Sequence, residues 1–560
     1  MPGRLQGAGL ELGPAGASHG GSAVTRAGAA GSVLAHHDAD AGASGGGRPH
    51  RLLTDRVPRA SGPLEVEARA GHVADGPHGG ARYRVVACGP CAQGARGAGA
   101  AGRGRHGVSA PVVVIGAGPS GLAAAHALLQ AGKRVVVLEA AEQVGGLSGS
   151  FDFAGFKVDY GPHRLHQAAG PEVLELYRSA LGGALHVRAR SGMVHVGGRQ
   201  LPYPLSLLGI ARGLGLSEVA RHGLSAVMAR LRPPEGSHFG AEAARRLGRH
   251  AARVLYEPAA RKVWGLPPEE LDASLGRARV QKGGPLAVVR AALGRGGASA
   301  GRRYFYPAGG FGALAEGLAE GIRRAGGEVR CGAAAEGLVL ERGRVRAVSV
   351  AGRELPAESV VATVPLPLLC DWVGRHEAAE GLGYRALTLL YLLLAKERGT
   401  SRDVHYFADE HLPANRLFEA RNFLGGEGPA GQTVVGFDLP CAVGDAIWSA
   451  SPEELTERVR PALERTGLAG VELLGARVRR MASAYPLYRR GFAAVRERAL
   501  NALSEVHGLY PLGRNALFVH DNVHHACAAG LAVGRLVAEG ASSRDWRGRQ
   551  KPFLETQIED

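Results

Sequence analysis

Three glycines, Gly116, Gly118 and Gly121, give the clearest indication of chemistry in this chain of 560 residues. They lie between an apolar run at 111–115 and a helical pattern at 120–130. In such a turn the first glycine permits the tight reversal, and the second lets the main chain approach a pyrophosphate. The third glycine lets helix and strand pack closely. Because a helix N-terminus also offers free N–H groups, the pattern predicts a dinucleotide phosphate site.

An acidic residue, Glu139, lies at the distance from the glycines that a dinucleotide site requires. Glu139 ends a second apolar run at 134–139, 18 residues beyond Gly121. A carboxylate about 20 residues after the glycines typically binds the ribose hydroxyls, and an acid here argues against a 2′-phosphate. The competing interpretation is a glycine turn in an unrelated α/β protein, which leaves the placing of the acid unexplained.

A second glycine pair, Gly145-Gly146, follows soon after Glu139 and is not needed by a plain NAD-binding domain. With the first loop it resembles the extended FAD fingerprint of the superfamily of flavin amine oxidases, phytoene desaturases and protoporphyrinogen oxidases. The resemblance implies FAD as the cofactor. The FAD-binding residues that it implies in this region are Gly116, Ala117, Gly118, Pro119, Ser120, Gly121, Glu139, Ala140, Gly145, Gly146 and Leu147.

The sequence Gly161-Pro162-His163-Arg164 is similar to the flavin-proximal loop of this superfamily. It is also similar to a Gly-x-His-x-x-His turn of UDP-galactopyranose mutases. The resemblance implies that Gly161, Pro162 and His163 contact the flavin. The alternative interpretation is that His163 only caps a turn and has no functional role. The stretch around Trp264 resembles a K-x-W-G motif of bacterial mutases and protoporphyrinogen-oxidase-like proteins. Trp264 is therefore either a wall of the substrate site or a core aromatic.

Later motifs extend the resemblance over about residues 109–545. A Tyr-Pro-x-Gly-Gly segment leads to the strand that ends at Val329, and Thr363 belongs to an A-T-x-P strand end. The sequences Gly513-Arg514 and Asp521-Asn522 resemble the strand–turn–helix under the flavin pyrimidine. The further FAD-binding residues implied are Val329, Thr363, Arg514, Asp521 and Asn522. His524 departs from the motif, which usually has Asp there, and Asp521 and Asn522 also suit a helix N-cap.

No motif identifies a catalytic residue, and the candidates are His163, Arg164 and Trp264. No Ser/His/Asp set and no His/Cys cluster with metal-ligand spacing is apparent, so no metal is expected. The resemblance implies an FAD-dependent oxidoreductase that removes hydride from a C–N or C–C bond of a small organic substrate. One alternative is a sugar-nucleotide mutase of the UDP-galactopyranose mutase type, and another is a non-catalytic flavin-fold binding protein.

The elements that must position these residues alternate between strand and helix, which predicts an α/β fold. We expect a Rossmann-like FAD-binding domain in three pieces, 109–170, 300–370 and 485–545. A helical insertion at 171–299 and an antiparallel-sheet substrate domain at 371–484 would complete the enzyme, with 546–560 as a tail. Helices are predicted at 171–181, 216–231 and 239–255, a buried strand at 386–395, and a last strand at 516–520.

Charge and hydropathy restrict the partners. The net charge is +16, yet only six of the 67 basic residues are lysine, which is typical of a GC-rich coding sequence. No basic block interleaved with aromatics suggests nucleic acid, so the remaining charge favours an anionic substrate or membrane surface. No apolar run reaches the ~18 residues of a membrane span. We expect a cytoplasmic enzyme of small molecules, with peripheral membrane contact as an alternative.

Residues 1–108 differ from the rest, since glycine, alanine and arginine dominate and no hydrophobic period persists. Such a segment buries no core, so a disordered tail is expected. The alternative hypothesis is that translation starts at Val108, because GUG is both a valine codon and a bacterial start. Cys88 and Cys91 form a lone C-x-x-C, too isolated to predict a zinc site.

Overall fold

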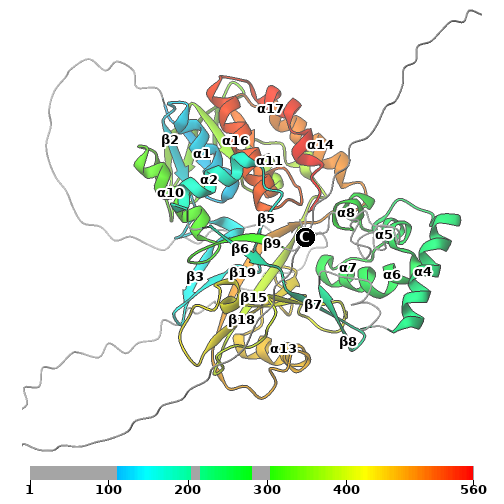
Figure 1. The fold of residues 1–560 in the computed structure, drawn as a ribbon. Coiled ribbons are helices and arrows are strands. Elements are labelled where there is room, and N and C mark those ends of the chain that lie inside the picture. Colours follow the sequence, from blue (N-terminus) through cyan, green and yellow to red (C-terminus); the bar gives the residue numbers. More distant parts are fainter. Residues whose placement is uncertain (1–109, 184, 204–212, 214, 281–302, 559–560) are drawn as a thin grey trace, which may run out of the picture. The chain divides into compact units, whose positions relative to one another are not determined.

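The computed structural model of this protein describes residues 110–183, 185–203, 213, 215–280 and 303–558. The glycine-rich segment before residue 109, with Cys88, Cys91 and Val108, lies outside the described residues, so the expectations for it stay untested. Within the described part, helices and strands alternate as the sequence predicts, and the fold is mixed α/β (Figure 1).

A five-stranded parallel sheet forms the first layer, in the order β10-β2-β1-β14-β20. Its strands are β1 (Val112–Ile115), β2 (Val135–Leu138), β10 (Glu328–Arg330), β14 (Ser359–Ala362) and β20 (Leu509–Pro511). They come from all three segments expected to build the FAD-binding domain. Every residue of β1, β2 and β14 is buried. Valine-rich strands without polar alternation are typical of parallel sheets covered on both faces.

Helices pack closely around this sheet. They include α1 (Pro119–Gln130), α2 (Pro171–Leu181), α10 (Ala313–Arg324) and α16 (Val523–Ala538). Helices α1 and α16 lie side by side although about 400 residues separate them (Figure 1). A Cβ added to Gly530 would lie 2.3 Å from the Ser120 carbonyl oxygen, and one on Gly534 would lie 2.6 Å from that of Ala124. The glycines therefore let the C-terminal helix contact the backbone of the phosphate-loop helix.

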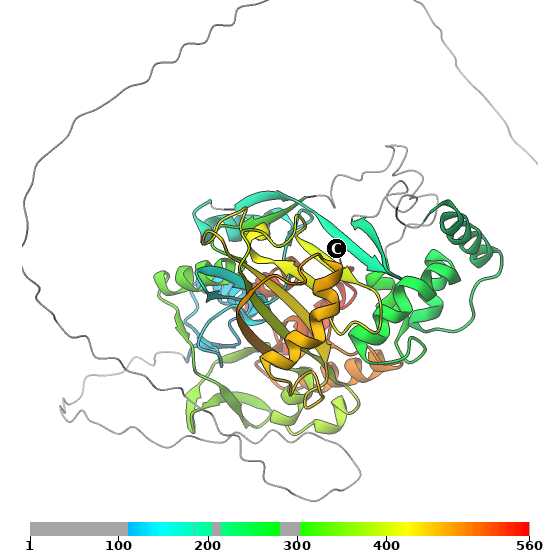
Figure 2. The ribbon, with the colours of Figure 1, turned by 90° about the horizontal axis from the view of Figure 1, so that it is seen from below.

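The second large sheet has seven strands in the order β19-β15-β18-β17-β16-β7-β8. They are β7 (Gly192–Val196), β8 (Arg199–Tyr203), β15 (Tyr384–Leu394), β16 (Val404–Phe407), β17 (Arg416–Glu419), β18 (Thr433–Cys441) and β19 (Leu473–Pro486). All neighbours are antiparallel except β16 and β7. Helix α13 (Pro452–Arg465) covers one face with Leu455 and Val459 (Figure 2). The apolar run in β15 is thus a buried strand, as predicted.

The segment 171–299 is less helical than expected. Besides β7 and β8 it contains β6 (Leu185–Ala189), which pairs with β9 (Arg303–Pro307). Two of these strands, β6 and β7, pair with strands more than 100 residues away, and β8 forms a local hairpin with β7. The side chains of β6 are mostly half or fully exposed, so this strand shows no strong hydrophobic alternation.

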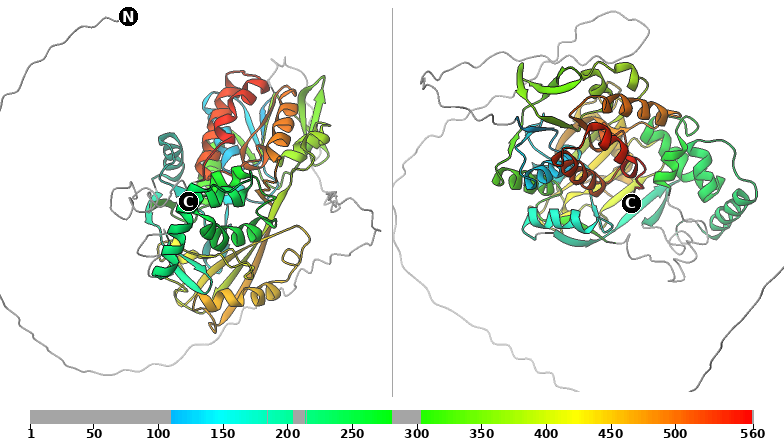
Figure 3. Two further views of the ribbon diagram at one scale, coloured as in Figure 1. Left: turned by 90° about the vertical axis from the view of Figure 1, so that its right-hand side faces the viewer. Right: turned by 90° about the horizontal axis from the view of Figure 1, so that it is seen from above.

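The helix expected at 239–255 is also broken. Gly248 has φ +92°, which ends α5 (Phe239–Leu247) and starts α6 (Arg249–Ala251). A π-helical turn and α7 (Glu257–Trp264) follow. With α4 (Leu216–Leu231) and α8 (Ala273–Arg279), these helices form a group of their own, drawn in green (Figure 3).

The strand expected at 516–520 is wrong. Residues Gly513–Ala516 form the short helix α15, and the sheet strand is β20, a few residues earlier. The run is apolar because it is buried, but Phe518 has φ +51°, which no strand accommodates. The helix expected near His524 is confirmed: α16 begins at Val523 with Asn522 as its N-cap.

The remaining elements connect these layers. Strands β11, β12 and β13 form a three-stranded antiparallel meander, while β14 joins the parallel sheet. The bounds are β3 (Ser150–Phe153), β4 (Phe156–Asp159), β5 (Leu165–His166), β11 (Ala335–Glu341), β12 (Arg344–Val350), β13 (Arg353–Pro356), α11 (Leu366–Trp372), α12 (Ala420–Phe423), α14 (Phe492–Ser504), α17 (Ser543–Arg549) and α18 (Lys551–Leu554). Across the described ranges, no helix combines the length and the apolar character that crossing a bilayer requires.

Candidate functional site

The first glycine loop has the geometry that its motif predicts. Gly116 has φ +101°, and a Cβ on it would lie 2.0 Å from Thr363 Oγ1. A Cβ on Gly121 would lie 2.0 Å from the Gly116 carbonyl oxygen. At Gly118, by contrast, the nearest atom to an added Cβ is Gly146 Cα at 3.9 Å. The first and third glycines therefore hold the turn, and the second leaves open space beside the main chain.

The second glycine pair is docked on this loop. The N–H of Gly145, which has φ +119°, donates to the Ala117 carbonyl at 2.9 Å. A Cβ on Gly146 would lie 3.2 Å from Gly118 Cα, so two backbones approach where side chains would separate them. Leu147 follows within the same short helical turn. The two glycine loops together form one cradle, which we call the phosphate cradle.

The N-terminus of α1 opens into this cradle. Gly118 is its N-cap and makes no side-chain cap, Pro119 is the first helical residue, and no acidic residue lies in the first turn. The N–H groups and the positive end of the helix dipole are thus available to an anion. The buried Ser120 lies against Gly513, where a Cβ would approach its Oγ to 2.5 Å.

Glu139 lies at the carboxyl end of β2. Its carboxylate accepts hydrogen bonds from the N–H groups of Ala117 at 2.7 Å and Ala141 at 2.9 Å. Its own N–H donates to the Arg330 carbonyl at 2.8 Å, beside Val329 in the adjacent strand β10. The loop thus fixes a carboxylate with lone pairs left for hydroxyl donors, while Ala140 beyond it is exposed.

Thr363 supports the cradle from β14. Its hydroxyl donates to the Ile115 carbonyl at 2.7 Å, and its N–H donates to the same oxygen at 2.9 Å. The side chain thus fills the place where a Cβ of Gly116 would be. Through these contacts Thr363 fixes the start of the glycine turn.

A buried carboxylate fixes the loop that contains His163. Asp159 accepts hydrogen bonds from the hydroxyls of Ser150 and Tyr306, both at 2.6 Å, and from the Phe311 N–H at 2.9 Å. Burial raises the pKa of Asp159 to about 6, although the three hydrogen bonds act in the opposite direction. The sequence motif indicated His163 and gave no role to Asp159. In the structure Asp159 joins the His163 loop to the segment that follows Tyr306.

His163 itself is a neutral ring braced against the protein. Its Nε2 donates to the Tyr160 carbonyl at 2.9 Å, and the ring stacks on Phe311 with centroids 5.4 Å apart. Burial, together with the charges of Arg416 and Arg514, lowers the pKa of His163 to about 4. The preceding Gly161 and Pro162 are buried, and Gly161 has φ +106°. The ring thus braces its own turn and carries no charge near pH 7, while its contact with the flavin stays a prediction.

Arg164 makes the contacts of a structural residue. Its guanidinium lies 3.6 Å from Asp403, and over the rings of Tyr304 and Phe423 at 5.1 and 5.2 Å. The Tyr304 hydroxyl donates to the same carboxylate at 3.3 Å. These contacts join the His163 loop to the seven-stranded sheet.

Trp264 belongs to a buried cluster of aromatic and arginine side chains. Its ring is edge-on to His520 and Tyr485, with centroids 4.9 and 5.7 Å apart. Arg279 lies over the indole at 5.4 Å, and its Nη2 is 3.4 Å from His520 Nδ1. Arg416 donates to the Tyr485 hydroxyl at 3.4 Å. We call these five residues the aromatic–arginine cluster, of which the sequence indicated only Trp264.

Electrostatics decide which side chains of this cluster are charged. Burial, with Arg279 and Arg514 nearby, lowers the pKa of His520, so the imidazole stays neutral. Burial opposes the charge of Arg416, but its 2.5 Å contact with the buried Asp438 keeps the pKa of Arg416 above its ordinary value. The charge of the cluster therefore resides on its guanidinium groups.

Lys262, two residues before Trp264, is structural. Its ammonium donates to the carbonyls of Phe407, Asp409 and Ala414 at 2.6, 2.8 and 3.1 Å. Burial lowers the pKa of Lys262 to about 8. This side chain anchors α7 to the loops that flank β16 and β17.

The C-terminal motif folds back on itself. Arg514 donates from Nε to Asp521 Oδ1 at 2.9 Å and from Nη2 to the Asp521 carbonyl. Asn522 caps α16 together with His525. His524, which stands where the family motif usually has Asp, is buried, and burial lowers its pKa to about 3. Next to Arg514, Asn515 Oδ1 is buried and has no hydrogen-bond partner among the described residues.

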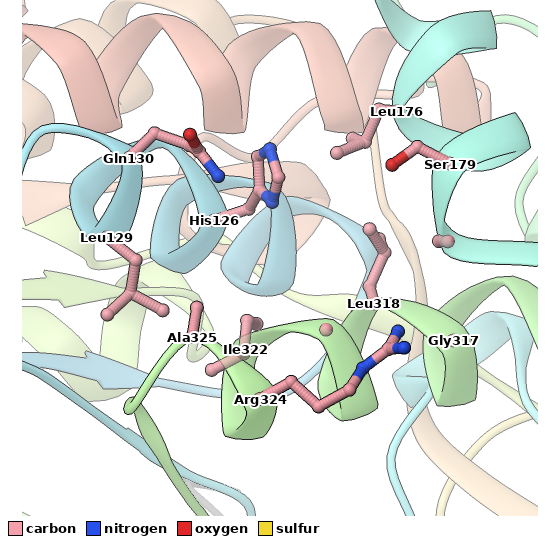
Figure 4. Close-up of a pocket in the computed structure, with 12 residues that line it drawn as sticks. His126, Leu129, Gln130, Leu176, Ser179, Gly317, Leu318, Ile322, Arg324 and Ala325 are labelled. Carbon is pink, nitrogen blue, oxygen red and sulfur yellow. The ribbon is translucent and has the colours of Figure 1, made fainter.

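A surface hollow of about 380 Å³ lies elsewhere (Figure 4). It is between α1, α2 and α10, and its lining includes His126, Gln130, Leu176, Ser179 and Arg324. His126 and Gln130 belong to the half of α1 that is far from Gly118, so this hollow is separate from the cradle.

Comparison with known proteins identifies the family. The family model described as flavin containing amine oxidoreductase matches residues 119–483, well over half of the chain. The chain belongs to this family and is an FAD-dependent oxidoreductase that acts on small molecules. The resemblance inferred from the motifs is thereby confirmed.

Curated relatives match only in part. A phytoene dehydrogenase of Streptomyces griseus is 45% identical over 71 residues, which is 13% of each protein. Polyamine oxidase 1 of Oryza sativa subsp. japonica is 40% identical over 105 residues, 18% of this chain and 20% of that protein. The aligned stretches thus span a fifth or less of these relatives.

Solved structures show the same fold over nearly their whole length. A reduced UDP-galactopyranose mutase has a TM-score of 0.66 at 20% identity, covering 80% of this chain and 98% of that one. Cyclohexylamine oxidase from Brevibacterium oxydans has a TM-score of 0.54 at 16% identity, covering 77% and 99%. At these identities the similarity establishes the fold and says nothing about substrate.

The described residues fit FAD. Gly118 leaves a space that a Cβ would fill, the start of α1 carries no competing cap, and Glu139 presents a fixed carboxylate. The buried Asn515 Oδ1 offers one more polar atom without a protein partner. These features suit the pyrophosphate, the adenosine ribose and the polar edge of a flavin.

Proposed function

We propose that this enzyme removes hydride from a C–N or C–C bond of a small organic substrate that carries an anionic group. The observation that supports the proposal is the aromatic–arginine cluster, where Arg279 and Arg416 flank three aromatic rings. Guanidinium groups bind carboxylate or phosphate and repel a protonated amine. The proposal therefore favours an anion over a simple cationic amine.

The chain's own residues position and enclose the substrate. Trp264 and Tyr485 offer apolar faces that exclude water, and Arg279 offers the anion a charged donor. His163 is held as a neutral ring, so it adds no further positive charge. FAD, when bound, supplies the two-electron acceptor.

A flavin-dependent mutase for a nucleotide sugar is the second candidate. It is favoured by the same two arginines and by Tyr485, a set of side chains that suits a diphosphate. Such a reaction leaves the oxidation state of its substrate unchanged and requires reduced flavin, whereas hydride removal starts from oxidised flavin.

The test is anaerobic mixing of the FAD-loaded enzyme with a panel of small carboxylates, phosphates and amines. We expect an anionic substrate to bleach the flavin absorbance without added reductant. The variant Arg279→Met should slow this bleaching, while Arg346→Met on the exposed surface should leave it unchanged. Turnover of a nucleotide sugar by dithionite-reduced enzyme alone would favour the mutase.

A further inference from the structure

Two histidines and a glutamate meet in the helical group, away from the phosphate cradle. Glu218 and His222 are one turn apart on α4, and His250 is in α6, which packs against α4 (Figure 1). One ligand atom from each of the three side chains lies within 4.8 Å of the others. Sequence inspection missed this group because His250 is far from the other two in the chain.

The backbone holds His250 in this position. A Cβ on Gly248 would lie 2.6 Å from the Ala226 N atom, so this glycine brings the start of α6 directly against α4. The N–H of His250 donates to Ser225 Oγ at 2.9 Å. The rings of His222 and His250 meet edge to face with centroids 4.6 Å apart.

The hydrogen bonds orient the ligand atoms. His222 Nδ1 donates to the Glu218 carbonyl at 2.8 Å, which leaves the lone pair on Nε2. That Nε2 is buried and has no hydrogen-bond partner among the described residues. Metal-bound histidines usually donate their second ring N–H to an oxygen in this manner. Arg221 holds the Oε1 atom of Glu218 at 2.8 Å, while Oε2 lies 2.8 Å from His250 Nε2.

We propose that Glu218, His222 and His250 bind a divalent transition-metal ion of the Zn²⁺ type, with water completing the coordination. Imidazole nitrogens and a carboxylate oxygen suit this ion, and bonds of about 2.0–2.2 Å place ligand atoms roughly 3–4 Å apart. The observed spacings, 2.8 Å from Glu218 Oε2 to His250 Nε2 and 4.0 Å from the same oxygen to the His222 ring, need only small shifts to reach that range. The ion replaces the proton shared between His250 and Glu218.

The poor packing of α4 gives the ion a structural role. Only Ala226 and Ala229 of this helix are buried, while Leu224 and Leu231 are 66% and 72% exposed. Two alanines provide little apolar area to hold a helix of 16 residues. A metal bound to α4 and α6 would cross-link them, and it would stabilise the folded state in proportion to its free concentration.

The experiment uses the tag-free, FAD-loaded full chain, freed of metal with a chelator and titrated with Zn²⁺ against a chromophoric competitor. We expect one equivalent of Zn²⁺ per chain, and visible d–d absorption bands when Co²⁺ is used instead. His222→Ala, His250→Ala and the isosteric Glu218→Gln should each weaken binding at least tenfold. The control His376→Ala removes an exposed histidine and should bind like the wild type.

The outcomes decide the proposal. Wild type that binds no Zn²⁺ overturns it, as do three variants that bind like the wild type. Flavin absorbance measured in every sample shows whether each variant has folded, and Glu218→Gln, which preserves side-chain shape, covers a failure of the alanine variants. Since metal binding is read without any substrate, its failure is distinct from failure of the proposed hydride chemistry.

Discussion

The phosphate cradle and the aromatic–arginine cluster are built in opposite ways. The cradle consists of main chain within residues 112–146, closed by contacts such as Gly145 N–H to Ala117 carbonyl. The cluster consists of side chains from five separate segments, held by ring contacts and by the buried Arg416–Asp438 pair. Changes in the cradle should therefore remove the cofactor, whereas changes in the cluster should spare the cofactor and alter the substrate reaction.

The largest expected effect on the cofactor is at Gly118. Gly118→Val places a side chain in the open space beside the helix N-terminus, which the pyrophosphate needs. We expect FAD affinity to fall by at least about 100-fold, or about 2.7 kcal/mol. Flavin absorbance of the purified protein and fluorescence titration of the apoprotein measure this loss. Gly321→Ala, at an open position on α10, should bind FAD normally. Full flavin content in Gly118→Val would contradict the cradle.

The second prediction concerns the loop that carries His163. Because burial raises the folded pKa of Asp159 from 3.8 to about 6, the folded state binds the extra proton. Its contribution to stability is full below pH 3.8 and is lost as pH rises through 6, a change of about 3 kcal/mol.

Asp159→Asn has no such proton to lose. Between pH 4 and pH 7 the free energy of unfolding of the wild type should fall relative to that of this variant. His163 titrates oppositely, since its depressed pKa makes its contribution fall as pH decreases, but that effect is common to both proteins. Urea unfolding across this range measures the difference. Parallel pH profiles would disprove the role given to Asp159.

The third prediction sharpens the role of Glu139. Glu139→Gln keeps one acceptor for Ala117 N–H, but it loses the second acceptor, for Ala141 N–H, and the charge that strengthens hydrogen bonds to the cofactor's hydroxyls. We expect FAD to bind about tenfold more weakly, or about 1.4 kcal/mol, with the fold intact. Isothermal titration with FAD measures the change, and Asp152→Asn on the exposed β3–β4 hairpin serves as control. An unchanged dissociation constant for FAD would show that Glu139 only stabilises the loop and does not bind the cofactor.

The sequence predicted the phosphate cradle well and the aromatic–arginine cluster poorly. Gly116, Gly118 and Gly121 identified the cradle because backbone geometry imposes glycine at fixed spacing. The β1 and β2 strands followed from continuous apolar runs, and the hydropathy pattern likewise predicted α1, α2 and α4. Local pattern is sufficient wherever neighbours in the chain are also neighbours in space.

Contacts between distant segments escaped prediction. Tyr485, His520 and Arg279 became visible as a group only when β19, the C-terminal loop and α8 came together. The strands β6 and β7 were missed for the same reason, since their distant pairing partners are β9 and β16. The run ending at His520 was read as a strand because burial makes sequences apolar whatever their backbone conformation.

The smallest expected effect on the cofactor is in the cluster. Arg279→Met should keep one FAD per chain, because Arg279 contacts Trp264 and His520, which are side chains of the cluster. Its rate of flavin reduction by an anionic substrate should fall about tenfold, the value of one charge-assisted hydrogen bond. Flavin content and stopped-flow absorbance separate the two effects. Loss of FAD in this variant would abolish the distinction between the two regions.

The central claim is that the enzyme takes hydride from its substrate onto oxidised FAD. Anaerobic stopped-flow with a substrate and with the same compound deuterated at the reacting carbon tests it directly. The account predicts flavin bleaching without added reductant, slowed when deuterium replaces hydrogen at the bond that breaks. A flavin that stays oxidised with every substrate, in an enzyme that turns over only after reduction by dithionite, would contradict it.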